Sequence, residues 1–417
     1  MNAIRKTVSV YQQVFVTNGR LVTFSFLMAL YSSFGQTYFV GVFGPAVQAE
    51  FGLSHTLWGT IYLLGTLASA VFLPISGALI DRFRLRPFAI AVSMLLVIAC
   101  LYTAWVPGPV GLVLAIFLLR HAGQGLASHV SVTSMARYFD RDRGRAIAIA
   151  AMGYTVGEAA LPFLAVLLIA GVGWRWTYAS AGIFIALTLI PAGLWLLRDH
   201  DTFHRRHIDG QARELDTGAP TKRSWTRAAV LRDARFYLLC PGILSSSLIV
   251  TAFFFHHLNI AVAKGWSGEW ITGTYILYAG AGSVTMLVAG PLIDRFTAVR
   301  VTQGMLVPLI LSCLLLALAT HPFTVLVYMV ILGVHSALAL TSISALWAEL
   351  YGVRNLGAIK SLYTALMVLS SALGPVIMGS LMDLGFSIAW VCTMFGVYAF
   401  IGNLLVVVAL RMKTTRL

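Results

Sequence analysis

Two copies of one short sequence decide the fold of this chain: GALIDRF at residues 77–83 and GPLIDRF at residues 290–296. The copies agree at six of seven positions and lie 213 residues apart. Each copy follows a long apolar run and contains an Asp-Arg pair, Asp81-Arg82 in the first and Asp294-Arg295 in the second. The repeat indicates that the chain consists of two related halves, each with an apolar helix that ends at the same kind of polar loop.

The composition outside these copies is that of a membrane protein. Of the 417 residues, 59% are hydrophobic and only 11% are charged, whereas a soluble domain carries roughly 25% charged residues. Many apolar runs reach or approach the ~20 residues that a helix needs to cross the hydrocarbon core. A membrane β-barrel is excluded because its strands alternate over segments of ~10 residues. We therefore expect an all-α integral membrane protein.

The breaks between apolar runs divide the chain into helices. Gly, Pro and charged residues predict twelve transmembrane helices, over residues 21–44, 57–80, 87–105, 109–133, 146–170, 176–197, 236–260, 270–293, 301–319, 323–348, 356–382 and 386–410.

The net charge of +14 is explained by the positions of the Lys and Arg residues relative to the membrane. With both termini on one side, 26 of the 29 Lys and Arg residues fall on that side. The positive-inside rule then predicts cytoplasmic termini in a plasma membrane, the inner membrane of a bacterium. The lipid bilayer therefore explains the basic balance, and no nucleic-acid partner is predicted.

The most polar stretch, residues 198–235, predicts a central cytoplasmic linker, because its composition cannot bury a core. It separates an N-terminal bundle of six helices (1–197) from a C-terminal bundle of six helices (236–417). An even number of helices in each half makes the two repeats parallel, related by an axis along the membrane normal. We expect two pseudo-symmetric bundles around a central cavity.

Twelve helices, a central loop and a duplicated Gly-x-x-x-Asp-Arg loop resemble the major facilitator superfamily. The segment Arg137-Tyr-Phe139, Arg143-Gly-Arg-Ala146, Gly153-x-x-x-Gly157 and Pro162 is similar to its monocarboxylate and oxalate/formate transporter branches. The resemblance implies secondary transport of a small molecule by alternating access. It also implies a charge network at the cytoplasmic helix ends, for which the candidate gating residues are Asp81, Arg82, Asp294, Arg295 and Arg143.

No pattern of catalysis or cofactor binding is found in the sequence. There is no Gly-rich loop of the type that binds nucleotide phosphates, and the four cysteines have no metal or redox spacing. We predict a transporter that is not an enzyme, that uses no cofactor or metal, and that acts as a monomer.

Two ionisable side chains fall near the middle of predicted helices, Arg120 and Glu158. Charges at this depth are expensive, so they are functional candidates by default. The guanidinium matches a carboxylate, which makes Arg120 a candidate anion anchor. Glu158 is a candidate proton carrier, because a carboxyl group can bind and release a proton during a transport cycle. The alternatives are a structural Arg–Glu pair and an arginine that only binds backbone carbonyls.

Further candidates are polar and aromatic groups at similar depth. Arg120, Gln124 and Ser128 form a stripe at α-helical i+4 spacing. His335, near the middle of its helix, is the second candidate proton carrier. The remaining candidate substrate-binding residues are Tyr31, Gln36, Tyr154, Tyr275, Tyr278 and Ser344.

These features predict a proton-linked transporter of a small organic anion, such as a monocarboxylate. Two alternatives stay open at this stage. One is a proton-coupled antiporter that exports amphipathic compounds, because Arg120 and the Gln124-Gly125 pair resemble a helix-four motif of such antiporters. The other is a receptor or scaffold on the same fold, because fold does not determine function.

Overall fold

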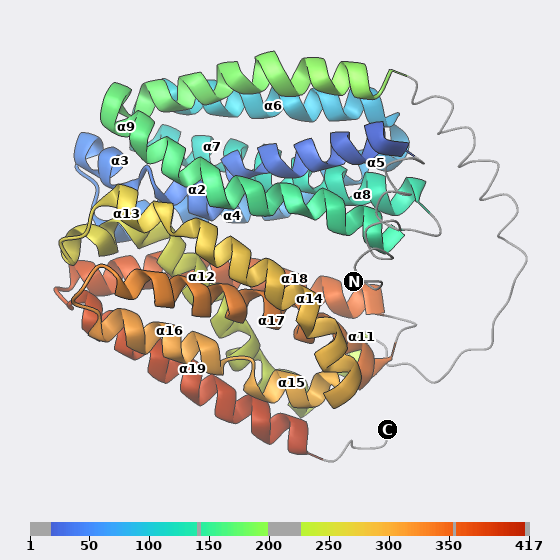
Figure 1. Cartoon of the computed structure of the whole chain (residues 1–417), viewed down its shortest axis with the longest axis vertical. Coiled ribbons are helices and arrows are strands. Elements are labelled where there is room, and N and C mark those ends of the chain that lie inside the picture. The colour runs from blue at the N-terminus through green and yellow to red at the C-terminus, as the bar shows by residue number, and fades with distance from the viewer. Residues whose placement is uncertain (1–17, 140–142, 199–226, 353–355, 413–417) are drawn as a thin grey trace, which may run out of the picture. The chain divides into compact units, whose positions relative to one another are not determined.

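The structure, a computed structural model, describes residues 18–139, 143–198, 227–352 and 356–412. The described residues are mostly helical and contain no β-strand. Most of the predicted linker 198–235 lies outside the described residues, as do both termini. Figure 1 shows the course of the helices along the chain.

The number of membrane-spanning helices agrees with the sequence. Among the described residues, ten helices are long and apolar enough to span a membrane, and the pair Asn18–Gly41 and Gly44–Phe51, bent by 62°, is an eleventh candidate. The 54-residue helix α9 (Arg143–Leu196) counts once among the ten, although Gly173 interrupts it with φ 82° and ψ 162°. At 1.5 Å per residue one straight helix of that length would be about 81 Å long, so α9 supplies two spans. The all-α membrane fold with twelve spans is confirmed.

The chain divides into two compact units. The first comprises Met1–Val40 and Leu64–Ala219, and the second comprises Gly41–Leu63 and Pro220–Leu417. This division departs from the repeat, because residues 41–63 precede the linker yet belong to the second unit. Helix α4 (His55–Gly77) therefore begins in the second unit and ends in the first.

In the first unit, residues 18–32 form the opening helix and α9 supplies the last two spans. The other elements of this unit are η1 (Ser33–Gly35), α5 (Leu79–Arg82), α6 (Leu85–Ala104), α7 (Pro109–Leu119), η2 (Arg120–Ala127) and α8 (Ser128–Tyr138), while α2 (Thr37–Gly41) ends at its boundary. Helix α9 packs against both α6 and α8.

The second unit contains α3 (Gly44–Phe51), α11 (Arg227–Val230), α12 (Ala234–Ala263), α13 (Gly268–Gly273), α14 (Tyr275–Phe296), α15 (Ala298–Gly304), α16 (Val307–Leu318), α17 (Thr324–Tyr351), α18 (Leu356–Asp383) and α19 (Ile388–Arg411). Figure 1 shows α16 lying along α19, and α12 packs against both α18 and α19. Aromatic side chains such as Phe253 on α12 and Trp347 on α17 are buried, while apolar side chains such as Leu287 stay exposed on the outer faces, as lipid contact requires.

Candidate functional site

The first predicted span, 21–44, is not one continuous helix. The helix of residues 18–32 passes into the short 3₁₀ segment η1, and Gln36 then has the extended backbone angles φ −82° and ψ 154° before the helix resumes at Thr37. An interruption of this kind leaves backbone groups without their helical partners, and in a membrane these groups need other partners. We call residues 33–36 the helix-one break.

Arg120 supplies one of these partners. Its Nη1 donates to the carbonyl oxygen of Gly35 at 3.3 Å and to Oγ1 of Thr37 at 3.2 Å. The Arg120 side chain is buried, with 4% of the residue exposed. A permanent positive charge is thus held inside the first unit, at the point where the backbone of the first span is interrupted.

The element that positions Arg120 is a π-helix, η2. Its Gly123 crosses Gly35 so closely that a Cβ atom on Gly123 would lie 2.7 Å from the Cα and the amide nitrogen of Gly35. Glycine at both positions is what permits this contact between backbones. π-helical turns within α-helices occur frequently at functional sites. The i+4 stripe expected from α-helical geometry is altered here, because Arg120 and Gln124 lie within a segment of π-helical pitch; Gln124 is half-buried.

The first half of α9 contacts the same break. Gly157 packs against the Ser33 side chain, and the Ser33 hydroxyl accepts a hydrogen bond from the Tyr38 hydroxyl at 2.8 Å. Glu158, the next residue on α9, is half-buried, and among the described residues no ion pair joins it to Arg120. The alternative of a structural Arg–Glu pair is therefore not supported among the described residues, and Arg120 donates to a backbone carbonyl and to a hydroxyl group.

Three other predicted residues of the first unit lie on neighbouring elements. Tyr31 is buried and shares a hydrogen bond of 2.5 Å with Thr188 of α9. Tyr154 donates from its hydroxyl to the Ser128 carbonyl at 3.4 Å. Gln36 lies in the break itself and is half-buried.

In the second unit, Tyr275 and Tyr278 are buried in an aromatic cluster. The Tyr275 hydroxyl shares a hydrogen bond of 2.8 Å with Nδ1 of His257, and both tyrosine rings meet Phe254 edge-on at centroid distances of 5.1 and 4.9 Å. Ser344 on α17 is exposed. The second-unit candidates therefore differ widely in exposure.

His335 is fully buried and uses both ring nitrogens. Its Nδ1 lies 2.9 Å from the Met305 carbonyl oxygen, between α15 and α16, and its Nε2 lies 2.8 Å from Oγ of Ser246. A carbonyl oxygen only accepts, so Nδ1 carries a proton and donates to Met305. His335 therefore supports the break between α15 and α16, much as Arg120 supports the helix-one break.

The predicted gating residues lie at the exposed helix ends. Asp81 and Arg137 approach to 3.9 Å between Oδ1 and Nη1, and Nε of Arg143 donates to the Phe139 carbonyl at 3.3 Å. Arg82 is exposed. An ion pair of this length at the surface contributes little stability.

The second copy of the loop is arranged differently. Asp294 and Arg295 are exposed, and no ion pair of Asp294 occurs among the described residues. Instead, the Glu349 carboxylate accepts a hydrogen bond of 2.8 Å from the backbone amide of Ala298, at the start of α15. The two copies therefore share a sequence but not a set of contacts.

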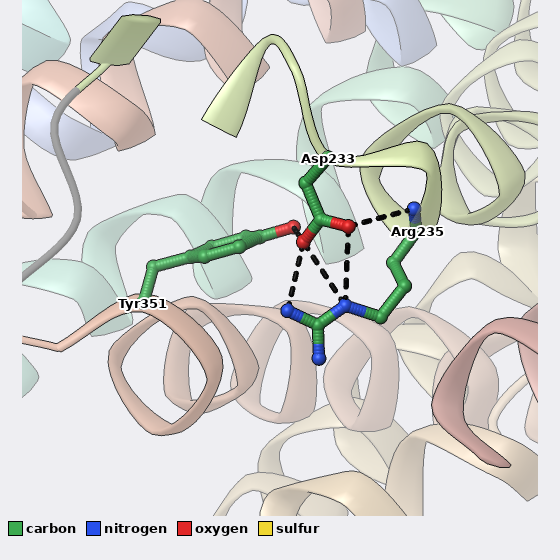
Figure 2. A network of polar contacts seen from close by, with 3 residues as sticks. All are labelled: Asp233, Arg235 and Tyr351. Carbon is green, nitrogen blue, oxygen red and sulfur yellow. Dashed lines mark hydrogen bonds and ion pairs between the residues drawn. The ribbon is translucent and has the colours of Figure 1, made fainter. Parts of the chain in front are cut away.

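Sequence reasoning missed a buried ion pair at the end of the predicted linker, shown in Figure 2. The Asp233 carboxylate accepts hydrogen bonds from the Arg235 amide at 3.0 Å and from the Tyr351 hydroxyl at 3.1 Å, and it lies 2.8 Å from Nη2 of Arg235. Burial raises the pKa of Asp233, but the hydrogen bonds and charge of Arg235 and the Tyr351 hydroxyl outweigh burial and hold it below its ordinary value. The signal in the sequence was an aspartate at the N-cap position of a long helix.

The described residues offer no group of three or more His, Cys, Asp or Glu side chains that would hold a metal ion. What they bring together in the first unit is a buried cation, an interrupted helix, a π-helix and a nearby carboxyl group. This combination places a fixed positive charge beside an interrupted membrane helix.

A family model described as Major Facilitator Superfamily matches residues 25–296 and 269–416. This chain belongs to the Major Facilitator Superfamily. The expectation from the sequence is thus confirmed, and this superfamily member is a multi-pass membrane transporter of small molecules and not an enzyme.

Two curated relatives are transporters. Over 187 residues the chain is 29% identical to the gallate transporter of Pseudomonas putida, a match that covers 44% of this chain and only 40% of that protein. Over 318 residues it is 22% identical to the MFS-type transporter pynF of Aspergillus niger, covering 74% of this chain and 67% of that protein.

Solved structures share the fold. The nucleoside transporter NupG has a TM-score of 0.71 at 15% identity, covering 94% of this chain and 99% of that chain. A bacterial homologue of the human lysosomal transporter Spinster has a TM-score of 0.69 at 16% identity, covering 94% of this chain and 96% of that chain.

Proposed function

We propose that this superfamily member is a proton-linked secondary transporter of a small organic anion. The observation that carries the proposal is Arg120, a buried, permanently charged guanidinium at the helix-one break. The relative named as a gallate transporter supports the same substrate class, because gallate is an aromatic carboxylate. A guanidinium matches a carboxylate by charge and by the geometry of its fork.

The proposed substrate-binding residues are grouped around that charge. Gln36, Thr37 and Gln124 are half-buried polar side chains on the two segments that cross at the break, and they supply donors and acceptors beside the guanidinium. An anion that draws Arg120 away from the Gly35 carbonyl also changes what holds the break together. Substrate binding and a change in the shape of helix one are then coupled.

The other proposed substrate-binding residues lie elsewhere in the two units. They are Tyr31 and Tyr154 in the first unit and Tyr275, Tyr278 and Ser344 in the second. Aromatic rings and hydroxyl groups of this kind suit an aromatic carboxylate better than a short aliphatic one.

For the coupled proton we propose Glu158 before His335. Glu158 follows Gly157, which packs on Ser33 in the helix-one break, so this carboxyl group belongs to the helix that contacts the break. His335 has both ring nitrogens engaged, by Ser246 and by the Met305 carbonyl. That arrangement favours a supporting role for the histidine.

Orientation follows from the charge pattern. The excess of Lys and Arg on one side supports cytoplasmic termini. The inner membrane of a bacterium and a monomer as the working unit are parts of the same proposal. The exposed loop that carries Asp81 and Arg82 then faces the cytoplasm, and the Asp81–Arg137 contact is part of the cytoplasmic gate.

The test is uptake into proteoliposomes that contain the purified full chain, with and without an imposed pH gradient. The panel contains gallate, benzoate, short monocarboxylates, and amphipathic amines. Accumulation of a carboxylate only when a pH gradient is present is the expected result. Accumulation of amines, driven in the opposite direction, would identify an exporter of amphipathic compounds. Binding of a panel member in a thermal-shift assay without any transport would identify a receptor.

A further inference from the structure

The first unit carries an open groove on its surface, where α6 packs against the last part of α9. Figure 1 shows these two segments side by side. The groove has a volume of about 380 Å³ and is lined by Arg86, Pro87, Ile90, Ala91, Met94 and Leu194. We call it the α6 groove. Its lining is apolar except for one arginine, which stands in the first turn of α6.

Small residues on both helices leave the space that forms the groove. Pro87, Ala91 and Met94 are spaced by four and three residues, so they lie on one face of α6, and Ala91 has the smallest side chain of this row. On α9 the residue before Leu194 is Gly193. A Cβ atom on Gly193 would lie 3.3 Å from Cδ1 of Ile90, so the two helices approach each other closely at this level.

The groove opens on the face of α6 that contacts lipid. Ala91 is exposed, and Met94 and Leu194 are 51% and 41% exposed. Ala89 and Val92, on the other side of the same helix, are buried. Contiguous exposed apolar side chains mark a surface that binds a membrane or another protein. In a membrane-spanning helix, acyl chains are therefore the first candidates to fill the groove.

An aromatic residue indicates the depth of the groove in the membrane. Trp195 follows Leu194 and is exposed, and tryptophan is enriched at the membrane–water interface. The guanidinium carbon of Arg20 lies 5.5 Å from the centre of the Trp195 ring. Helix α9 ends one residue later, and the exposed Arg198 follows. The end of the groove at Arg86 thus lies at the level of the lipid headgroups.

The length of the groove matches one leaflet. From Arg86 to Met94, α6 advances by eight residues, or about 12 Å at 1.5 Å per residue. One half of the hydrocarbon core is about 15 Å thick. A single acyl chain, whose headgroup lies beside Arg86, therefore fits along the groove. A helix of another protein that crosses the whole core of about 30 Å would extend far beyond it.

The charge at the headgroup end is positive and is not neutralised by the protein. Arg86 is exposed, and no ion pair of Arg86 occurs among the described residues. Arg82 and Arg84 precede it and are exposed as well. Asp81, the one acidic residue of the sequence 77–87, lies 3.9 Å from Arg137 instead. A free guanidinium at this level attracts the phosphate of an anionic lipid.

We propose that the α6 groove binds one anionic phospholipid, with the phosphate group at Arg86 and an acyl chain along Ala91 and Met94. Apolar contact does not by itself select a lipid, because lipid tails are as apolar as the side chains. The headgroup charge does select, as in other basic pockets between membrane helices. The lipid contacts α6 and α9 together, next to the opening helix, since a Cβ atom on Gly193 would lie 3.9 Å from Cε2 of Phe24. Its binding therefore stabilises the packing of the first unit.

The test compares two lipids that share their acyl chains and differ in headgroup charge, phosphatidylglycerol and phosphatidylcholine. Native mass spectrometry of the purified full chain, in detergent with equal amounts of both, counts the lipids that stay bound. We expect the parent to bind phosphatidylglycerol about fivefold better, the effect of one arginine near an anionic headgroup. Thermal unfolding should show stabilisation by phosphatidylglycerol and less by phosphatidylcholine.

Two variants separate the charge from the shape of the groove. Arg86→Gln should lower the binding of phosphatidylglycerol about fivefold, to the level of phosphatidylcholine. Ala91→Leu keeps the charge but fills the groove, so it should lower the binding of both lipids. The controls are Arg411→Gln, at an exposed arginine that ends α19, and Ala170→Leu, at an exposed alanine in the first half of α9. Both controls should bind lipid as the parent does.

A photoreactive group identifies the place of binding. Phosphatidylglycerol with a diazirine in one acyl chain should label the peptide that contains Ala91 and Met94 in the parent, and should label it less in Ala91→Leu. Because Arg86 is exposed, Arg86→Gln and this labelling test the proposal even if Ala91→Leu is unstable. Thermal unfolding of each variant without added lipid verifies that it is folded.

Equal binding of the two lipids by the parent would overturn the proposal, as would a preference for phosphatidylglycerol that Arg86→Gln retains. A dimer in the mass spectrum that Ala91→Leu dissociates would also overturn it, because a second copy of the chain would then cover the groove. These measurements use no transported substrate. Their outcome is therefore separate from that of the proteoliposome experiment.

Discussion

Replacing Arg120 with lysine separates the two roles that its guanidinium combines, support of the helix-one break and binding of a carboxylate. Nη1 makes two hydrogen bonds at the long end of the normal range, 3.3 Å to the Gly35 carbonyl and 3.2 Å to the Thr37 hydroxyl. Hydrogen bonds from a charged donor contribute about 1.5–3 kcal/mol each, so the lower value applies to both. Arg120→Gln should therefore lower the stability of the unliganded protein by about 3 kcal/mol, and Arg120→Lys, which keeps one such bond, by about 1.5 kcal/mol.

Binding of the substrate gives a second and independent quantity. A ligand at 100 times its Kd stabilises the folded protein by about 2.7 kcal/mol, and a tenfold weaker ligand at the same concentration by about 1.4 kcal/mol. Lysine keeps the charge of Arg120 but not the fork that fits a carboxylate. We expect the stabilisation by the best carboxylate of the panel to fall to about half in Arg120→Lys, measured by thermal unfolding of the purified protein with and without the ligand.

Arg175 provides the matched control. Its guanidinium also holds backbone carbonyls, those of Ala104 at 2.8 Å and Val106 at 3.1 Å, but it lies just after the Gly173 interruption of α9, 18 residues beyond the Gly157 that contacts the helix-one break. Arg175→Lys should lower the stability of the unliganded protein and leave the ligand-induced stabilisation as it is in the parent. If the ligand stabilises Arg120→Lys as much as the parent, Arg120 only supports the break and the anion binds elsewhere.

Three further predictions concern the crossing, the proton carrier and the buried ion pair. Gly123→Ala places a methyl group 2.7 Å from the Gly35 backbone and should lower stability by about 1–3 kcal/mol, whereas Gly280→Ala, where a Cβ meets nothing within 4 Å, should not destabilise the protein. Glu158→Gln imitates the protonated carboxyl group, so it should abolish accumulation driven by a pH gradient in proteoliposomes but retain counterflow exchange; full gradient-driven accumulation would exclude Glu158 as the carrier. The Asp233 pKa lies below its ordinary value, so its stabilising contribution is present above about pH 4 and is lost as the pH falls through the lowered pKa. Asp233→Asn should therefore lower the thermal stability at pH 7 by about 3–5 kcal/mol and flatten its decrease toward acid pH.

The spans were predictable because the membrane imposes one requirement on every segment that crosses it. A run of about 20 apolar residues satisfies that requirement locally, and so the sequence predicted even the division of α9 near Gly173. The bend in the first span was not predictable in this way. Residues 21–44 are apolar without interruption by a charge, and the helix is broken at Ser33–Gln36 where Gly35 meets the Gly123 backbone, 88 residues further along the chain.

For the candidate site the sequence indicated which residues to consider but not their hydrogen-bond or ion-pair partners. An arginine and a glutamate at mid-helix are unusual enough to mark Arg120 and Glu158, but an ion pair between them was as consistent with the spacing as binding to backbone carbonyls. In the structure Arg120 donates to a backbone carbonyl, that of Gly35 in the helix-one break. The π-helical pitch of η2 likewise has no signature in the i+4 spacing.

The sequence by itself determined that this protein crosses the membrane in two repeats of six helices, because hydrophobic length and the GALIDRF duplication are properties of consecutive residues. Only the tertiary structure decided which polar groups meet. Gln48, Asn259 and Asp383 are unremarkable in the sequence, yet Asn259 donates to Gln48 and the His55 amide donates to Asp383, because segments more than 200 and 300 residues apart are packed together. A hydrogen bond depends on the positions of two atoms to within a fraction of an ångström, and pattern along a single chain carries no information at that scale.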